Sequence, residues 1–154
     1  MKEKIKGILA GIAYKIIVLL TLGQISPLLG AGIIIEQDGK ILLIDRSDRL
    51  GYTVPGGIVR HKETIEECVL RETCEETGYT VKITGFVGVY SSPDRDPRFR
   101  AVAITYKGSI VDGTPHGSGE GEPCWRAPEE VFGHMAFDCE RMLKDYLSDQ
   151  VHYV

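Results

Sequence analysis

Three glutamates near the middle of the chain have the type and spacing of a divalent-metal site. On a helix, Glu72, Glu75 and Glu76 fall within an arc of roughly 100°. Like charges this close repel one another, and Arg71 offsets only part of that repulsion. Hard cations such as Mg²⁺ or Mn²⁺ take oxygen ligands and would neutralise the rest. On spacing alone, a solvated acidic helix is the commoner explanation, so the surrounding sequence must decide.

Both ends of a helix are marked around these glutamates. Thr64, with Glu67 three residues later, has the pattern of a capping box, and Gly78 is a typical C-terminal stop. These signals predict a helix of about 13 residues between Thr64 and Gly78. The three carboxylates would therefore lie on one face of a short, well-defined helix.

The segment from Gly57 to Tyr79 resembles the signature of the Nudix family, the Nudix box G-x5-E-x7-R-E-U-x-E-E-x-G-U, where U is apolar. Every fixed position of that motif is occupied at the right spacing, by Gly57, Glu63, Arg71, Glu72, Glu75, Glu76 and Gly78. Thr73 stands where an aliphatic residue is usual, which is a small change in packing. The resemblance extends over about residues 30 to 148.

The resemblance implies a Nudix fold of the α/β (α+β) class, a mixed β-sheet sandwiched between helices. It also implies a hydrolase that depends on Mg²⁺ or Mn²⁺ and cleaves a nucleoside diphosphate linked to another group. By motif position, the metal ligands would be the carboxylates of Glu72, Glu75 and Glu76 and the carbonyl of Gly57. Glu63 and Arg71 would orient those carboxylates through charge-assisted hydrogen bonds.

Hydrolysis of a pyrophosphate also needs a general base beside the attacking water. The first candidate is Glu75 in the box. The second is Glu120, because the segment from Glu120 to Trp125 resembles the one before the last strand in nucleotide-cleaning members of the family. A flexible, solvated loop acid explains Glu120 equally well, so the base stays open between the two.

Arginines outside the box are expected to bind the substrate. The segment from Val89 to Arg98 is similar to the V-Y-S-x-P-x-R-D-P-R loop of a Nudix branch that includes ADP-ribose pyrophosphatases. Its Arg95 and Arg98 can hold phosphate bidentately, although both could instead form a structural knot of salt bridges with Asp96. Arg46 and Arg49 could add contacts to phosphate or base.

The predicted substrate is therefore ADP-ribose or a related derivative. One alternative is a pyrophosphohydrolase of nucleoside triphosphates, including oxidised ones. Another, of a different class, is a Nudix ligand sensor without catalysis, against which the complete set of glutamates argues.

Apolar runs and turn residues predict the remaining elements. A hairpin joins strands at 32–36 and 40–45, further strands span 81–90 and 101–107, and an amphipathic helix runs from Cys139 to Leu147. Gly113 to Pro123, rich in glycine, is expected to be a mobile loop.

Residues 1–23 are predicted to form an extra hydrophobic helix before a domain at residues 29–150. This helix could dock on the domain or on a second copy of the chain, giving a homodimer. It could also lie on a membrane surface, or be a true span or signal. Lys15 interrupts the apolar run, whereas a span needs about 20 apolar residues, so docking is favoured narrowly over the membrane surface.

The composition suits one domain that binds a small molecule. The chain has 154 residues and a net charge of −4, which provides no general basic field for nucleic acid. The charge is uneven: residues 63–76 hold six acids and one arginine, and residues 1–23 hold four lysines and one glutamate. Four cysteines without a Cys-x-x-Cys pair predict reduced thiols and a cytoplasmic protein, with peripheral membrane association left open.

Overall fold

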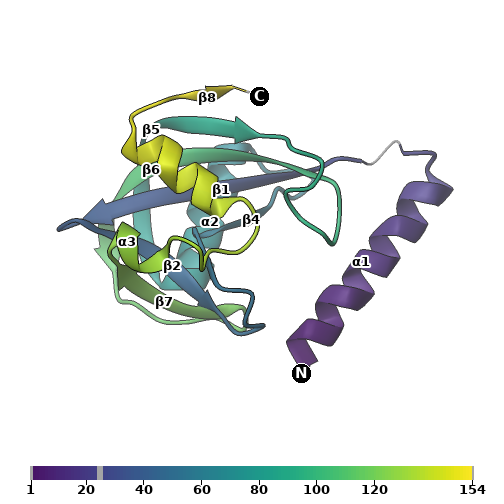
Figure 1. Ribbon diagram of the computed structural model, residues 1–154, viewed down its shortest axis with the longest axis horizontal. Helices are drawn as coiled ribbons and strands as arrows, with labels where there is room; N and C mark the ends of the chain where they lie inside the picture. The colour runs from purple at the N-terminus through teal and green to yellow at the C-terminus, as the bar shows by residue number, and fades with distance from the viewer. Residues whose placement is uncertain (1, 24–25, 154) are drawn as a thin grey trace.

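The computed structural model describes residues 2–23 and 26–153. A mixed sheet has helix α2 (Ile65–Thr77) against one face and α4 (Cys139–Leu147) against the other, as the sequence predicts (Figure 1). Helices α1 (Lys2–Leu20) and α3 (Pro128–Val131) complete the helical part that is described. The strands are β1 (Leu28–Gln37), β2 (Lys40–Arg46), β3 (Tyr52–Thr53), β4 (Gly56–Ile58), β5 (Tyr79–Tyr90), β6 (Ala101–Gly113), β7 (Gly121–Arg126) and β8 (His152–Tyr153).

Strand β1 is the central connection of the sheet, whose order is β3-β2-β1-β6-β5-β8. It runs parallel to β6, with Leu28 opposite Ala101, and its last residues pair antiparallel with β2. Its glycine-containing start also pairs antiparallel with β4, where Ala31 lies opposite Gly57. The start of the Nudix-like motif is therefore tied directly to the middle of the sheet.

The core explains why β1 and β2 read as unbroken apolar runs. In β1, Ile33 and Ile35 pack with Val69 on the α2 side, whereas Ile34 packs with Leu143 on the α4 side. Side chains alternate between the faces of a strand, so a sheet covered by helices on both faces needs apolar residues at successive positions.

The hairpin between β1 and β2 is confirmed, and its turn residues Asp38 and Gly39 both have positive φ angles, of 53° and 74°. The glycine-rich loop is shorter than expected. Strand β6 continues to Gly113 and β7 begins at Gly121, which leaves residues 114–120 for the loop. Strand β7 includes Pro123, which is tolerated because β7 pairs with β2 alone among the described strands.

Helix α1 lies to one side of the domain, beside the loop that joins β5 to β6 (Figure 1). Its last helical residue is Leu20, three residues before the expected end, and Met1 lies outside the described residues. Within the described parts of the chain, no helix has the length and apolar content needed to cross a membrane.

Candidate active site

Helix α2, which carries the glutamates, has the predicted ends. The Glu67 amide donates to Thr64 Oγ1 at 3.1 Å and the Thr64 amide donates to Glu67 Oε2 at 2.8 Å, which completes the capping box. Gly78 ends the helix at φ 76°. The unusual Thr73 is buried, and its hydroxyl donates to the Val69 carbonyl at 2.6 Å, so a polar side chain is satisfied inside the core.

The motif glycine allows helix α2 to approach β4 closely. A Cβ atom on Gly57 would collide with the carboxylate of Glu72. One turn further along the helix, Glu76 is only 6% exposed, and its Oε2 accepts a hydrogen bond of 2.8 Å from the Gly56 amide. Gly57, Glu72 and Glu76 therefore lie together where the sheet meets the helix.

Arg71 connects the motif carboxylates to one another. Its Nε and Nη2 donate to the two oxygens of Glu63 at 2.6 and 2.9 Å. Its Nη1 lies 2.7 Å from Glu72 Oε1 and donates to Glu75 Oε2 at 3.2 Å. The Arg71 guanidinium, with the Arg60 amide, lowers the pKa of Glu63 to about 2. These contacts gather the carboxylates of Glu63, Glu72 and Glu75 around one guanidinium, and the orienting role of Glu63 and Arg71 stays a prediction.

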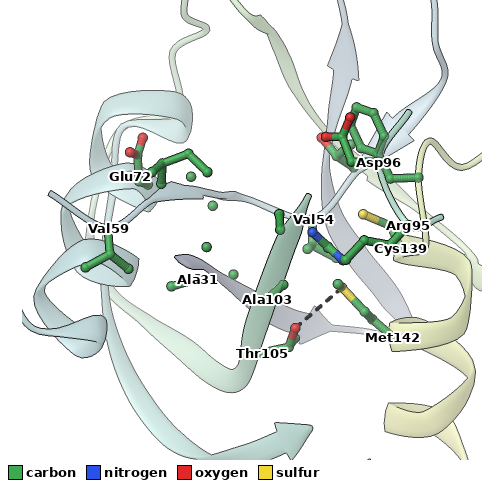
Figure 2. A pocket seen from close by; sticks show the side chains of 18 of the residues that line it. Ala31, Val54, Val59, Glu72, Arg95, Asp96, Ala103, Thr105, Cys139 and Met142 are labelled. Carbon is green, nitrogen blue, oxygen red and sulfur yellow. Dashed lines mark hydrogen bonds between the residues drawn. The ribbon is translucent and has the colours of Figure 1, made fainter. Parts of the chain in front are cut away.

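A cavity of about 600 Å³ brings the motif together with residues from distant segments. Of the predicted site residues, those that line it are Gly57, Glu72, Glu76, Glu120, Arg46, Arg95 and Arg98. Figure 2 shows Glu72 on one wall and Arg95 with Asp96 on the opposite wall. Thr105 and Met142 line the space between them, and Thr105 Oγ1 lies 3.4 Å from Met142 Sδ (Figure 2). Carboxylates and guanidinium groups thus face the same space.

Glu75 does not share this position. Its side chain is 50% exposed and pairs with Arg71 and, at 3.5 Å, with Arg60. Glu72 and Glu76 are one turn apart on the helix, while Glu75 is rotated about 100° from Glu76, and its ion pairs with Arg60 and Arg71 hold its carboxylate away from the cavity. Glu75 is absent from the lining of the cavity as far as the chain is described.

The oxygen groups at the cavity suit a hard divalent cation. Burial raises the pKa of Glu76 to about 8, with a further contribution from the charges of Glu120 and Glu72, while the Gly56 amide opposes the shift. A cation favours the charged carboxylates in such a place. In the described residues no three His, Cys, Asp or Glu side chains form a ready metal-holding group. The Gly57 carbonyl and the carboxylates of Glu72, Glu75 and Glu76 remain predicted ligands.

Three arginines that line the cavity, Arg46, Arg95 and Arg98, are each held by an aspartate, whereas Arg60, which also lines it, pairs with Glu75. Arg95 binds both oxygens of Asp138, at 2.9 and 2.8 Å. Arg98 likewise binds Asp96, at 3.0 and 2.8 Å, and Arg46 binds Asp48, at 3.0 and 2.6 Å. A guanidinium has five N–H donors, so these pairs leave others for a ligand. The salt-bridge alternative and the substrate-binding one are therefore compatible.

Arg49 differs from these three arginines. It is exposed, has a φ of 65°, and is absent from the described lining of the cavity.

Phe137 belongs to the site although sequence reasoning did not select it. Its ring lies 4.5 Å from the Arg98 guanidinium carbon and 5.1 Å from that of Arg46. The residue has a φ of 58°, which a non-glycine residue seldom adopts. Its aromatic type just before a helix was a signal, but the sequence could not show that Arg46 and Arg98, which are distant along the chain, both contact its ring.

Comparison with known families decides the relationship. The model of the NUDIX domain matches residues 27–146. The chain belongs to the Nudix family. It is a Nudix hydrolase that acts on phosphoric anhydride bonds, and hydrolases of this family generally need divalent metal ions. The resemblance found in the sequence and the fold it implied are confirmed.

Two curated Nudix relatives show the range of substrates named for similar chains. An ADP-ribose pyrophosphatase of Methanocaldococcus jannaschii is 37% identical over 126 residues, which cover 80% of this chain and 75% of the relative. A putative 8-oxo-dGTP diphosphatase of Bacillus subtilis is 30% identical over 116 residues, which cover 74% of this chain and 75% of the relative.

Among solved structures, a Nudix hydrolase from Nitrosomonas europaea matches with a TM-score of 0.71 and 25% identity. The match covers 83% of this chain and 78% of that one.

Proposed function

We propose that this Nudix hydrolase is a Mg²⁺-dependent pyrophosphohydrolase of ADP-ribose or a related nucleoside diphosphate derivative. The observation that carries the proposal is the cavity in which Glu72 and Glu76 face Arg95 and Arg98. A pyrophosphate joined to a sugar at each end carries negative charge at its centre, which cations must neutralise. It also needs hydrogen-bond donors along its length. The cavity volume of about 600 Å³ is in the range of small-molecule sites. The name of the Methanocaldococcus relative agrees with this substrate.

In this proposal the metal is held by the carboxylates of Glu72 and Glu76 and the carbonyl of Gly57, with Glu75 as the remaining motif ligand. A bound Mg²⁺, or Mn²⁺, neutralises pyrophosphate oxygens and lowers the pKa of an attacking water. Arg71 and Glu63 keep the glutamates oriented through the hydrogen bonds described above. Arg46, Arg95 and Arg98 donate to the substrate.

The location of Glu120 favours it over Glu75 as the general base. Glu120 lines the cavity, and its charge acts on Glu76. Its backbone carbonyl accepts hydrogen bonds from the Ser47 amide at 2.9 Å and from Ser47 Oγ at 3.0 Å, which fixes the end of the loop. Glu75, by contrast, is half-exposed and engaged with Arg71.

A substrate panel tests the proposal. Purified full-length protein with Mg²⁺ is given ADP-ribose, other nucleoside diphosphate sugars, 8-oxo-dGTP and ordinary nucleoside triphosphates, and the products are separated by chromatography. ADP-ribose is expected to yield AMP and ribose 5-phosphate. Release of pyrophosphate from triphosphates alone would replace ADP-ribose with the alternative that the Bacillus relative suggests. Binding of ADP-ribose without turnover would instead indicate a sensor.

We also propose that residues 1–23 contact an anionic membrane surface. Five apolar side chains on one stripe of α1 are half-exposed or more, namely Ile5, Leu9, Ile12, Ile16 and Leu20. Four lysines in residues 1–23 give this region a charge complementary to anionic lipid.

Full-length protein should therefore sediment with phosphatidylglycerol vesicles and remain in solution with phosphatidylcholine vesicles. Analytical ultracentrifugation tests the alternative that this apolar stripe binds a second copy of the chain. A dimer that dissociates in the Leu9→Ser, Ile16→Ser double variant would support that alternative and contradict the membrane proposal.

A further inference from the structure

Helix α1 packs closely against the backbone of the loop that carries Arg98. A Cβ atom on Gly11 would lie 3.1 Å from the Arg98 carbonyl oxygen, and one on Gly7 would lie 3.8 Å from Arg98 Cδ. Gly11 is buried, whereas its helical neighbours Ala10 and Ile12 are exposed. The two glycines thus form the face by which the helix approaches the domain.

Tyr14 joins the same face of α1 to the next residues of the loop. Its hydroxyl donates to the Arg100 carbonyl at 3.1 Å and lies 2.8 Å from Ser26 Oγ. Its ring meets that of Phe99 edge to face, with centroids 5.7 Å apart. The Arg100 carbonyl also accepts from the Leu28 amide at 3.0 Å, where β1 begins to pair with β6. One backbone carbonyl therefore ties the helix, the loop and the sheet together.

Arg98 lies between α1 and the active-site cavity. It lines that cavity and also a second one of about 330 Å³, to which Gly11 and Lys15 of α1 contribute. The loop from 91 to 100 contains no helix or strand, and Figure 1 shows it facing α1. Its backbone position consequently depends on the groups that pack against it, and α1 supplies several of them.

We propose that Gly11 and Tyr14 are positioning residues: through the backbone of residues 98–100 they hold the Arg98 guanidinium in place for the substrate. The inference rests on the proposed function in taking Arg98 as a substrate contact. Neither residue lines the active-site cavity in the described structure, and both act through the loop. Removing their contacts should weaken substrate binding without changing the carboxylates that serve the chemical step.

Kinetics of matched variants tests the proposal. Gly11→Leu inserts a side chain between helix and loop, Tyr14→Phe removes only the hydroxyl, and Ala10→Leu adds bulk on the exposed side of the same helix as a control. Gly11→Leu should raise KM about tenfold and Tyr14→Phe about threefold, with kcat within about twofold of the wild type. Ala10→Leu should behave as the wild type. The substrate is whichever pyrophosphate compound the wild type hydrolyses fastest, so failure of the ADP-ribose assignment does not affect the comparison.

Hydrogen exchange supplies a readout without substrate. Exchange of the Leu28 amide and of the amides of residues 98–101 should accelerate in Gly11→Leu and Tyr14→Phe and stay unchanged in Ala10→Leu. If Gly11→Leu fails to fold, as judged by circular dichroism, Gly11→Ala and Tyr14→Phe decide the question. Wild-type KM in the folded variants, or wild-type exchange in this segment, would overturn the proposal.

Discussion

Arg71 donates two parallel hydrogen bonds to Glu63, from Nε at 2.6 Å and from Nη2 at 2.9 Å, across eight residues of sequence. The pair closes the loop between β4 and α2 onto the helix. The same guanidinium reaches Glu72 and Glu75, so one arginine determines where three carboxylates of the motif lie.

The Glu63–Arg71 pair should make stability depend on pH in the acid range. The pKa of Glu63 is lowered from 4.5 to about 2, so the folded form favours the charged carboxylate. The resulting stabilisation is present in full above pH 4.5 and is lost as the pH falls toward 2. In urea unfolding, Glu63→Gln should be less stable than the wild type at pH 7, and the difference should shrink below pH 4.5.

The exposed Asp94→Asn variant is the control for that experiment, with an expected change below about 0.5 kcal/mol. A stability difference for Glu63→Gln that is constant from pH 7 to pH 2.5 would contradict the role of the ion pair.

Neutral replacement of the cavity glutamates should abolish most of the turnover. Glu72→Gln and Glu76→Gln keep the side-chain shape but remove the charges that face the cavity, and rates with saturating Mg²⁺ should fall roughly 100-fold or more. Chelation of the metal should have a similar effect on the wild type. Glu129→Gln, at an exposed position on α3, should retain full activity. Unchanged turnover in Glu76→Gln would refute the metal assignment.

Replacing cavity arginines by lysine should affect binding more than catalysis. Lysine cannot reproduce a planar, bidentate donor, so Arg95→Lys and Arg98→Lys should each raise KM about tenfold. Arg49→Lys makes the same chemical change outside the cavity lining and should alter KM less than twofold, an effect of about 0.4 kcal/mol at most. An equal rise in KM for Arg95→Lys, Arg98→Lys and Arg49→Lys would contradict substrate binding by the two arginines that line the cavity.

The four free thiols should react at different rates with an aromatic disulfide reagent at pH 8. Cys74 is exposed, whereas burial raises the pKa of Cys68 to about 12 and that of Cys139 to about 11. Burial also raises the pKa of the partly buried Cys124. A raised pKa leaves less of the reactive thiolate, so one thiol should react fast. Cys74→Ser should remove that fast phase, and its persistence would show that another cysteine is accessible.

The sequence could predict the parts of the molecule whose structure is determined by residues close together in the chain. Helix α2 has both caps within its own segment, and the helical period places Glu72 and Glu76 on one face. The helical period could not predict whether the Glu75 side chain faces the cavity or the solvent. Its position depends on neighbours outside the helix, namely β4 and Arg60. The short strand β4 exists through its pairing with Gly30–Gly32 of β1. Likewise, the position of Phe137 and the contact of Tyr14 with Arg100 join segments far apart in the chain.

The pairing of Arg46, Arg95 and Arg98 with one aspartate each affects which anions can bind at their wall of the cavity. Asp48, Asp96 and Asp138 already balance Arg46, Arg98 and Arg95, so that wall offers directed N–H donors with little net positive charge. An anion without bound metal therefore gains little binding free energy from electrostatic attraction to this wall. Inorganic phosphate should consequently compete poorly with the nucleotide substrate. The enzyme would then distinguish a nucleotide that arrives with its cations from the many metal-free anions around it.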